Sequence, residues 1–185
     1  MTYSSETSST WPKQKWPVSV NAVIPISTPE FWRLIEEPGH FEKFHPFVAK
    51  HSAIQWPGDN AHDVVEYYGG GVYERRFIEW SEHCLRIEAC EKEERLVFVE
   101  WHIYPKSSTE TDLTIYMKPL TLKKYPKLLR YLAYRVYIYS MLKNYTNHVM
   151  KGLIYYIETG KTVERNQFGA MNYFSPKVTC TSWRR

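Results

Sequence analysis

Residues 27–48 read STPEFWRLIEEPGHFEKFHPFV and encode two short helices in close succession. Ser27 to Glu30 is a capping box with proline in the first turn, which predicts a helix that ends at Pro38-Gly39. A second helix of barely two turns follows from His40 to Pro46, where proline stops it. Two such helices cannot bury their aromatic side chains against each other alone. We therefore expect a larger apolar surface behind them.

The sequence on both sides of these helices predicts strands. Val18 to Ile26 places an apolar residue at every second position, as a half-buried strand does. After the second helix the period of two continues to Lys118, with short turns between the runs, and short turns join antiparallel neighbours. The further candidate strands are Ala49–Trp56, His62–Tyr68, Val72–Trp80, Cys84–Glu91, Arg95–Tyr104 and Thr111–Lys118.

A long helix is predicted after the last strand. It begins at Tyr125-Pro126 and runs to about Glu158, with Gly160 placed to end it. Its apolar residues recur at three- and four-residue steps or their multiples and form one stripe over about nine turns. The stripe consists of Leu128, Leu132, Val136, Tyr139, Leu142, Val149, Leu153 and Ile157. A helix of this length can cover one face of the sheet.

The order of these elements predicts an α+β fold: a seven-stranded antiparallel sheet curved around a long C-terminal helix, with two short helices after the first strand. The short helices plug one end of the curved sheet and turn the gap between sheet and helix into a cavity. We expect a flexible leader at residues 1–16, a ligand-binding domain at residues 17–160 and a C-terminal tail at residues 161–185. The tail is apolar in places, so we expect it to pack against its own domain or against a second copy in a homodimer.

This order of elements, with STPEFW in the first short helix and FEKFHPFV at the second, resembles the START and polyketide-cyclase-like superfamily, SRPBCC, whose shape is the helix-grip fold. The resemblance covers roughly residues 17–160. In that superfamily the first helix typically opens with a small residue, proline and an acidic residue, and it carries a tryptophan, here Trp32. The second typically leads into an aromatic-x-Pro segment, here Phe44-His45-Pro46.

The resemblance implies a cavity for a hydrophobic or amphipathic small molecule, such as a lipid, a polyketide or a quinone. The implied function is binding, transport or modification of that molecule. Two alternatives stay open at this point: an enzyme of the polyketide cyclase/dehydratase type that uses the same cavity, and an interaction module that docks through its C-terminal tail. The fold alone does not choose among them.

Candidate ligand-binding residues come from the elements expected around the cavity. The short helices supply aromatic rings, the strands supply charged groups that can do acid–base chemistry if they face inward, and the long helix supplies its apolar stripe. The candidates are Trp32, Phe41, Phe44, His45, Phe47, Glu66, Tyr68, Glu74, Arg76, Trp101, Arg135, Tyr139, Leu142 and Thr146. No catalytic residue is assigned, since no Ser-His-Asp or Cys-His order is recognisable.

Strand parity leaves two of these assignments open. The charged residues Glu74 and Arg76 alternate with other side chains in Val72–Trp80, and that strand can present either set to the cavity. In Arg95–Tyr104, by contrast, the clean apolar set places Glu100 and His102 on the outer face.

Two other candidates have alternative interpretations. His45 either lies at the rim of the pocket or orders the turn before Pro46. Arg135 projects within the apolar stripe, where a charge is costly unless it is paired with a carboxylate of the ligand or of an inward Glu66 or Glu74. The alternative is that Arg135 runs along the apolar surface and places its guanidinium in solvent.

Composition and spacing exclude several classes of protein. No run of eighteen apolar residues predicts a transmembrane helix, and the first residues lack the apolar core of a secretory signal. Cys84 and Cys90 lie too far apart on one predicted strand to be bridged, and with Cys180 they leave at least one thiol unpaired, so we expect a reducing, cytoplasmic location. The seven histidines show no spacing such as HExxH, and we expect neither a metal nor a cofactor.

The net charge of +4 is spread along the chain, so no nucleic acid partner is expected. The densest basic run is interpreted as a solvated helix end and consists of Lys123, Lys124, Lys127 and Arg130.

Overall fold

The computed structural model of the chain describes residues 17–120, 126 and 131–177. Seven antiparallel strands form one sheet in the order β1-β7-β6-β5-β4-β3-β2. The strands are β1 (Val18–Ile24), β2 (Val48–Gln55), β3 (His62–Tyr67), β4 (Val72–Ser81), β5 (Cys84–Glu91), β6 (Glu94–Pro105) and β7 (Thr111–Pro119). The helices are α1 (Thr28–Glu36), α2 (His40–Phe44), the π-helix η2 (Tyr134–Ile138) and α4 (Tyr139–Thr159), and residues 131–133 are helical as well.

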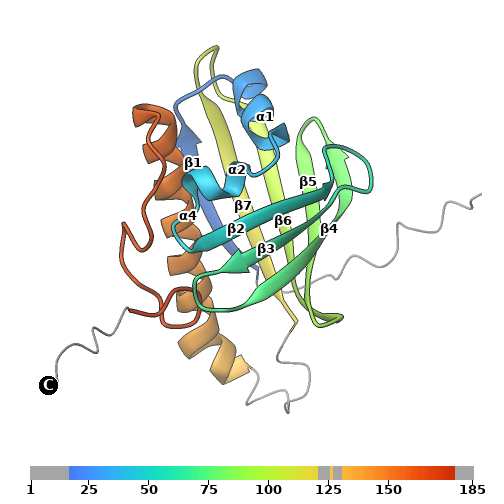
Figure 1. The fold of residues 1–185 in the computed structure, drawn as a ribbon, viewed down its shortest axis with the longest axis vertical. Coiled ribbons are helices and arrows are strands. Elements are labelled where there is room, and N and C mark those ends of the chain that lie inside the picture. Colours follow the sequence, from blue (N-terminus) through green and yellow to red (C-terminus); the bar gives the residue numbers. More distant parts are fainter. Residues whose placement is uncertain (1–16, 121–125, 127–130, 178–185) are drawn as a thin grey trace, which may run out of the picture.

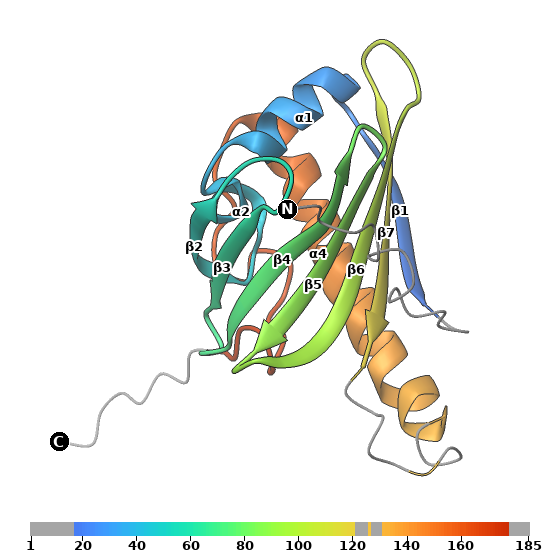
Figure 2. The same cartoon turned by 90° about the vertical axis from the view of Figure 1, so that its right-hand side faces the viewer.

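The arrangement confirms the predicted α+β helix-grip fold, and every predicted strand is present. Figures 1 and 2 show the sheet curving around α4, with α1 at one end of the molecule, the beginning of the long helix at the other, and α2 beside β2. The core lies between the sheet and α4. Its buried side chains include Leu85, Trp101, Ile103, Leu113, Ile115, Leu142, Val149 and Leu153.

Local sequence explains the two short helices. The backbone N–H of Ser27 donates to the Glu30 carboxylate (3.1 Å), which is the predicted capping box. Gly39 has φ +79° and begins α2, so the residue that separates the helices occupies the left-handed region that glycine tolerates. The four phenylalanines of this stretch, Phe31, Phe41, Phe44 and Phe47, are then buried, and Trp32 is half-buried.

The beginning of the long helix differs from the prediction. Leu132 and Val136, expected in the buried stripe, are exposed, whereas Tyr134 is buried. The wider turn of η2 rotates these side chains away from the positions that an unbroken α-helical period assigns. Further along, in α4, the predicted stripe is buried at Leu142, Val149 and Leu153.

Residues 161–177 of the predicted tail pack against the chain's own fold. The backbone N–H of Val163 donates to the Lys43 carbonyl (2.9 Å), and that of Asn166 donates to the Pro46 carbonyl (3.0 Å). His148 of α4 is buried, and its Nε2–H donates to the Phe168 carbonyl of the tail (2.8 Å). The expected packing of the tail against its own domain is confirmed for these residues.

Several sequence predictions lie outside the described residues: the leader 1–16, the helix start near Tyr125, Leu128 and the basic run Lys123, Lys124, Lys127 and Arg130. Within the described part of the chain, no helix is both long and apolar enough to cross a bilayer.

Candidate functional site

A cavity of about 390 Å³ lies between the sheet and the long helix. Its walls are mainly apolar and include Ile87, Val99, Trp101, Ile115 and Met117 from the sheet and Met141, Leu142 and Val149 from α4. Small-molecule pockets typically enclose ~300–1,000 Å³ and have few polar groups. The cavity therefore has the size and the lining that an apolar or amphipathic ligand requires.

The cavity reaches the surface beside η2. Tyr137 of η2 and Tyr173 of the tail both line it and both are exposed. Leu96 near the start of β6 and Pro119 at the end of β7 also line it and are half-buried. These four residues mark the mouth, through which a ligand can enter.

A chain of three polar side chains lies deeper in the cavity. The Phe47 backbone N–H donates to His45 Nδ1 (3.2 Å), so Nδ1 is the unprotonated ring nitrogen and Nε2 carries the hydrogen. Burial, helped by the charge of Arg75, lowers the pKa of His45 to about 3, which keeps the ring neutral at physiological pH. His45 Nε2–H then donates to the Tyr145 hydroxyl (2.9 Å).

The Tyr145 hydroxyl is also 2.6 Å from the Tyr67 hydroxyl. Burial raises the pKa of both phenols, so both keep their hydrogens. His45, Tyr145 and Tyr67 together carry three hydrogens that can be donated, one N–H and two O–H. The two hydrogen bonds among them use only two of these. One phenolic hydrogen remains, and it has no acceptor among the described residues. Because both phenols line the cavity, this hydrogen is available to a ligand there.

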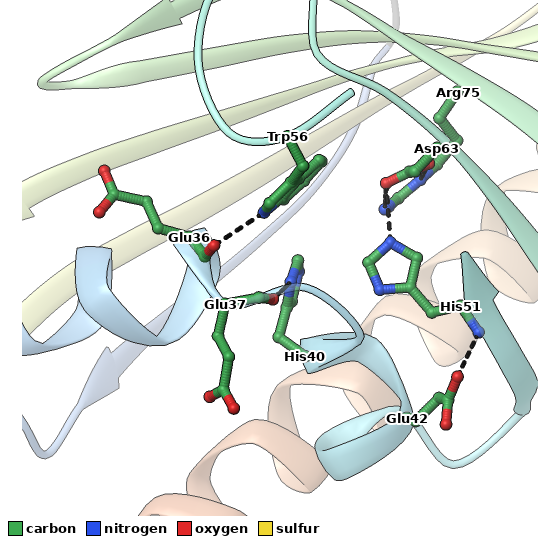
Figure 3. Close-up of polar contacts among 8 residues, drawn as sticks. All are labelled: Glu36, Glu37, His40, Glu42, His51, Trp56, Asp63 and Arg75. Carbon is green, nitrogen blue, oxygen red and sulfur yellow. Dashed lines mark hydrogen bonds and ion pairs between the residues drawn. The ribbon is translucent and has the colours of Figure 1, made fainter. Parts of the chain in front are cut away.

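The cavity also contains a guanidinium group. Arg75 on β4 lies directly opposite Asp63 on β3, as Figure 3 shows. Arg75 Nε donates to Asp63 Oδ1 (2.7 Å) and Nη2 donates to Oδ2, while His51 Nε2 donates to Oδ2 (2.9 Å). The Phe41 ring centroid is 4.1 Å from the guanidinium carbon. The pair and the ring hold Arg75 in one orientation against the cavity wall.

This buried pair stays charged. Burial alone raises the pKa of Asp63, but the Arg75 charge and the hydrogen bonds from His51 and Arg75 outweigh it and lower the pKa to about 2. Burial alone lowers the pKa of Arg75, and Asp63 more than offsets that effect. Two of the five N–H groups of Arg75 bind Asp63, and the other three have no acceptor among the described residues.

A second layer of hydrogen bonds fixes the short helices behind this pair (Figure 3). The Glu42 carboxylate accepts from the His51 backbone N–H (2.7 Å), and the Glu36 carbonyl accepts from Trp56 Nε1–H (3.0 Å). His40 Nδ1–H donates to the Glu37 carbonyl (2.9 Å). The first two bonds connect α2 to β2 and α1 to the turn after β2, and the third connects α2 to the end of α1.

The structure brings five of the residues predicted from the sequence to the cavity: Phe41, His45, Trp101, Leu142 and Thr146. Three other predicted residues are packed behind it. Phe44 and Phe47 are fully buried in the core, and Trp32 packs against Trp80 and donates to the Glu82 carbonyl (3.1 Å).

The predicted charged strand residues lie on the outer face. In β4 the side chains of Tyr73, Arg75 and Phe77 face inward. Glu74 and Arg76, whose side of the sheet the sequence left open, therefore face outward. The outer residues pair with each other or with neighbours: Glu66 with Lys50, Glu74 with His62 and Arg76, and Glu100 with Lys118 and Arg86. His102 lies beside Tyr116 on the face expected for it.

The remaining predicted residues also lie outside the cavity. Tyr68 is exposed in the turn after β3, where Arg165 covers its ring (4.9 Å). Arg135 is exposed as well, with its guanidinium carbon 5.8 Å from the half-buried Tyr139 ring. The π-helical turn explains this placement, because the expected position within the stripe assumed an α-helix.

Sequence reasoning missed Tyr67, Tyr73, Arg75 and Tyr145. A signal for the first three was present: Asp63, Val65 and Tyr67 share one parity, and so do Tyr73, Arg75 and Phe77 across the glycine-rich hairpin. Within the described residues, no group of His, Cys, Asp and Glu side chains has the number and proximity that a metal ion needs.

Comparison with known protein families finds no match, and neither does comparison with curated proteins. Solved structures do match. DynU16, from the dynemicin biosynthetic locus, aligns with a TM-score of 0.60 and 16% identity over 81% of this chain and 51% of its own. A START superfamily protein from Mycobacterium smegmatis aligns with a TM-score of 0.58 and 11% identity over 78% of this chain and 99% of its own.

The Zhui aromatase/cyclase from Streptomyces sp. R1128 aligns with a TM-score of 0.58 and 10% identity over 77% of this chain and 93% of its own. The chain thus spans about half the length of DynU16 and nearly the whole length of the other two. At such identities the likeness concerns the fold alone.

Proposed function

The chain has the START/polyketide-cyclase-like helix-grip fold, and on that basis we propose that it binds one hydrophobic small molecule in its cavity. The ligand places an oxygen acceptor at Arg75 and at the Tyr67–Tyr145 pair, and its apolar skeleton lies along the walls between β5–β7 and α4. A carrier needs little more than this: an apolar pocket with a few polar groups that orient the ligand.

The observation that carries the proposal is an excess of hydrogen-bond donors in an apolar cavity. Arg75 has three unused N–H groups and the two phenols share one unused O–H. The described lining contains no carboxylate to accept them. Buried donors without acceptors are costly, so the cavity favours a ligand that supplies oxygen acceptors, such as a ketone, a quinone or a carboxylate.

Two measurements test this function. Native mass spectrometry of the protein purified from its own host is expected to find one copy of a hydrophobic compound per chain. Titration of purified protein with an apolar fluorescent probe is expected to saturate at one site, and a carbonyl-bearing compound is expected to displace the probe better than its deoxy analogue. Ligand-free protein that also fails to bind the probe would overturn the proposal.

The same donors favour a second candidate, a cyclase-type enzyme. Hydrogen bonds directed at a carbonyl oxygen stabilise the negative charge that develops there when an enolate or alkoxide forms. A general base is harder to identify. Asp63 is held by Arg75 and His51, and both nitrogens of His45 are engaged. Faster cyclisation of a poly-β-ketone thioester with the protein than without it would favour this candidate over a carrier, provided that the rate falls in a variant that carries both Tyr67→Phe and Tyr145→Phe.

The described part of the tail does not favour the third possibility, an interaction module. Residues 161–177 contact their own chain, and Phe174 lines the cavity.

A further inference from the structure

Three apolar side chains are exposed together at the beginning of the long helix. Leu132, Val136 and Tyr137 have relative exposures of 56%, 69% and 65%. Leu132 and Val136 are about one helical turn apart, and Tyr137 follows directly. Single exposed apolar residues need no explanation, but a group of them beside an opening is typical of an interaction surface.

This group is continuous with the mouth of the cavity. Tyr137 both belongs to it and lines the cavity, and Ile138 lines the cavity next to it. The π-helix η2 spans Tyr134–Ile138, so the turn that exposes Val136 and Tyr137 is the same turn that forms one side of the mouth. Figures 1 and 2 place this part of the helix at the end of the molecule opposite α1.

The charge of this region has one sign. From Pro119 to Ser140 the sequence contains no acidic residue and five cations: Lys123, Lys124, Lys127, Arg130 and Arg135. Of these five cations, Arg135 is the one that lies among the described residues, and its side chain is exposed beside Val136. The acidic turn between β5 and β6, with Glu91, Glu93 and Glu94, is separated from the beginning of the helix in both views. The sequence that leads into the helix is therefore cationic, and its one described cation, Arg135, is exposed beside the mouth.

We propose that Leu132, Arg135, Val136 and Tyr137 form a docking surface for an anionic lipid bilayer, so that the cavity exchanges its ligand with the membrane. Apolar and aromatic side chains enter the boundary between headgroups and acyl chains, while flanking cations attract anionic headgroups. A soluble polyanion accounts for the cations alone, whereas a bilayer accounts for the exposed apolar side chains as well. The exchange of ligand rests on the proposed cavity function, but the docking itself does not.

Co-sedimentation with vesicles tests the docking. The full chain is expected to bind vesicles of phosphatidylcholine and phosphatidylserine more tightly than vesicles of phosphatidylcholine alone. The double substitution Leu132→Ser and Val136→Ser is expected to weaken that binding about tenfold or more, since it removes two apolar side chains from the interface. Arg135→Gln is expected to weaken binding to the anionic vesicles and to reduce its dependence on salt.

Ile54→Ser is the matched control, because Ile54 is 62% exposed on β2 and does not line the cavity. It is expected to bind vesicles like the parent chain. Equal weakening by Ile54→Ser, unchanged binding of the double variant, or no vesicle binding by the parent chain would each overturn the inference. Retention on heparin without vesicle binding would assign the cations to a soluble polyanion, and that outcome also contradicts a membrane surface.

Binding of the apolar probe without vesicles separates the two proposals. Leu132 and Val136 do not line the cavity, so the double variant is expected to bind the probe with unchanged affinity. If the parent chain binds the probe normally but does not bind vesicles, the proposed docking surface is wrong and the proposed cavity function stands. If the parent chain binds vesicles but takes up no probe, the proposed cavity function is wrong and the proposed docking surface stands.

Discussion

The hydroxyl oxygen of Tyr67 lies 2.6 Å from that of Tyr145, and His45 donates to the same Tyr145 oxygen from 2.9 Å. A backbone contact decides which groups donate in this series of hydrogen bonds. The Phe47 N–H donates to Nδ1 of His45, so the hydrogen of the His45 ring is on Nε2. The neutral ring cannot accept a hydrogen from either phenol. The remaining phenolic hydrogen is therefore directed to the cavity by the fold itself, before any ligand is present.

A variant that carries both Tyr67→Phe and Tyr145→Phe is expected to weaken the binding of carbonyl-bearing ligands by about 0.5–1.5 kcal/mol, because it leaves no phenolic hydrogen for the ligand while both rings remain. Ligands that lack the oxygen are expected to bind as before. Displacement of an apolar probe measures both affinities. Tyr104→Phe is the control, since Tyr104 is exposed on β6 and does not line the cavity. Equal losses for both ligand types would contradict a directed hydrogen bond.

Because Arg75 and Asp63 form a buried ion pair, we expect the loss of Arg75 alone to destabilise the fold more than the loss of both residues. Arg75→Met is expected to lower the free energy of unfolding by about 3–5 kcal/mol, because it leaves the Asp63 carboxylate buried without its charge partner. A chain that carries both Arg75→Met and Asp63→Leu is expected to recover much of this loss, since no charge is then stranded. Urea denaturation measures each variant.

Arg76→Met provides the control for this pair. Arg76 is the exposed neighbour of Arg75 and pairs with Glu74 on the surface, so its loss is expected to cost less than about 0.5 kcal/mol. If Arg75→Met were no more destabilising than Arg76→Met, the guanidinium would not be the buried partner of Asp63.

The order of elements could be predicted from the sequence because its signals are local. The capping box at Ser27 and the alternation in β5 and β7 each act within a few residues. The side chains that face the cavity were harder to predict. In β4 both parities contain apolar and charged residues, and the choice of Arg75 over Arg76 depends on Asp63, which lies on another strand.

Two further errors have physical causes that no short window of sequence reveals. The prediction that Arg135 lies on the buried stripe assumes an unbroken α-helical period. The π-helix η2 interrupts that period, and a π-helical turn has no simple residue signature. Tyr145 was missed because its burial depends on Phe174 of the tail, whose ring centroid is 4.3 Å away and 29 residues later in the chain.

Stability is expected to fall as the pH drops below about 6.5, because His45 is buried as a neutral ring. Burial lowers its pKa from 6.5 to about 3, so between these values the unfolded chain binds a proton that the native chain does not. Each pH unit in that window costs at most about 1.4 kcal/mol from this residue. Burial lowers the pKa of His40 as well, which adds to the effect. Asp63 contributes only at lower pH, since its pKa falls from 3.8 to about 2 and its stabilising effect is lost across that range.

Thermal melts at a series of pH values measure this dependence. His45→Gln removes the titrating ring and keeps a donor and an acceptor, so its stability is expected to change less steeply between pH 6 and pH 4 than that of the parent chain. The exposed His83 provides the control, and His83→Gln is expected to keep the parent slope. Identical slopes for the parent chain and His45→Gln would contradict a neutral, buried His45.

The last prediction concerns Gly152, which marks the closest approach of α4 to α2. A Cβ at this position would lie 2.1 Å from the Phe44 carbonyl oxygen, a backbone atom that moves only if α2 itself moves. Gly152→Ala is therefore expected to destabilise the fold by about 2–4 kcal/mol, although alanine is the better helix former by about 1 kcal/mol. Because α2 leads directly into His45, the displacement is also expected to lengthen the His45–Tyr145 hydrogen bond and to weaken carbonyl-bearing ligands. Ser140→Ala, on the exposed side of the same helix, is expected to be neutral or slightly stabilising. Equal melting temperatures for Gly152→Ala and Ser140→Ala would show that the two helices do not meet at this glycine.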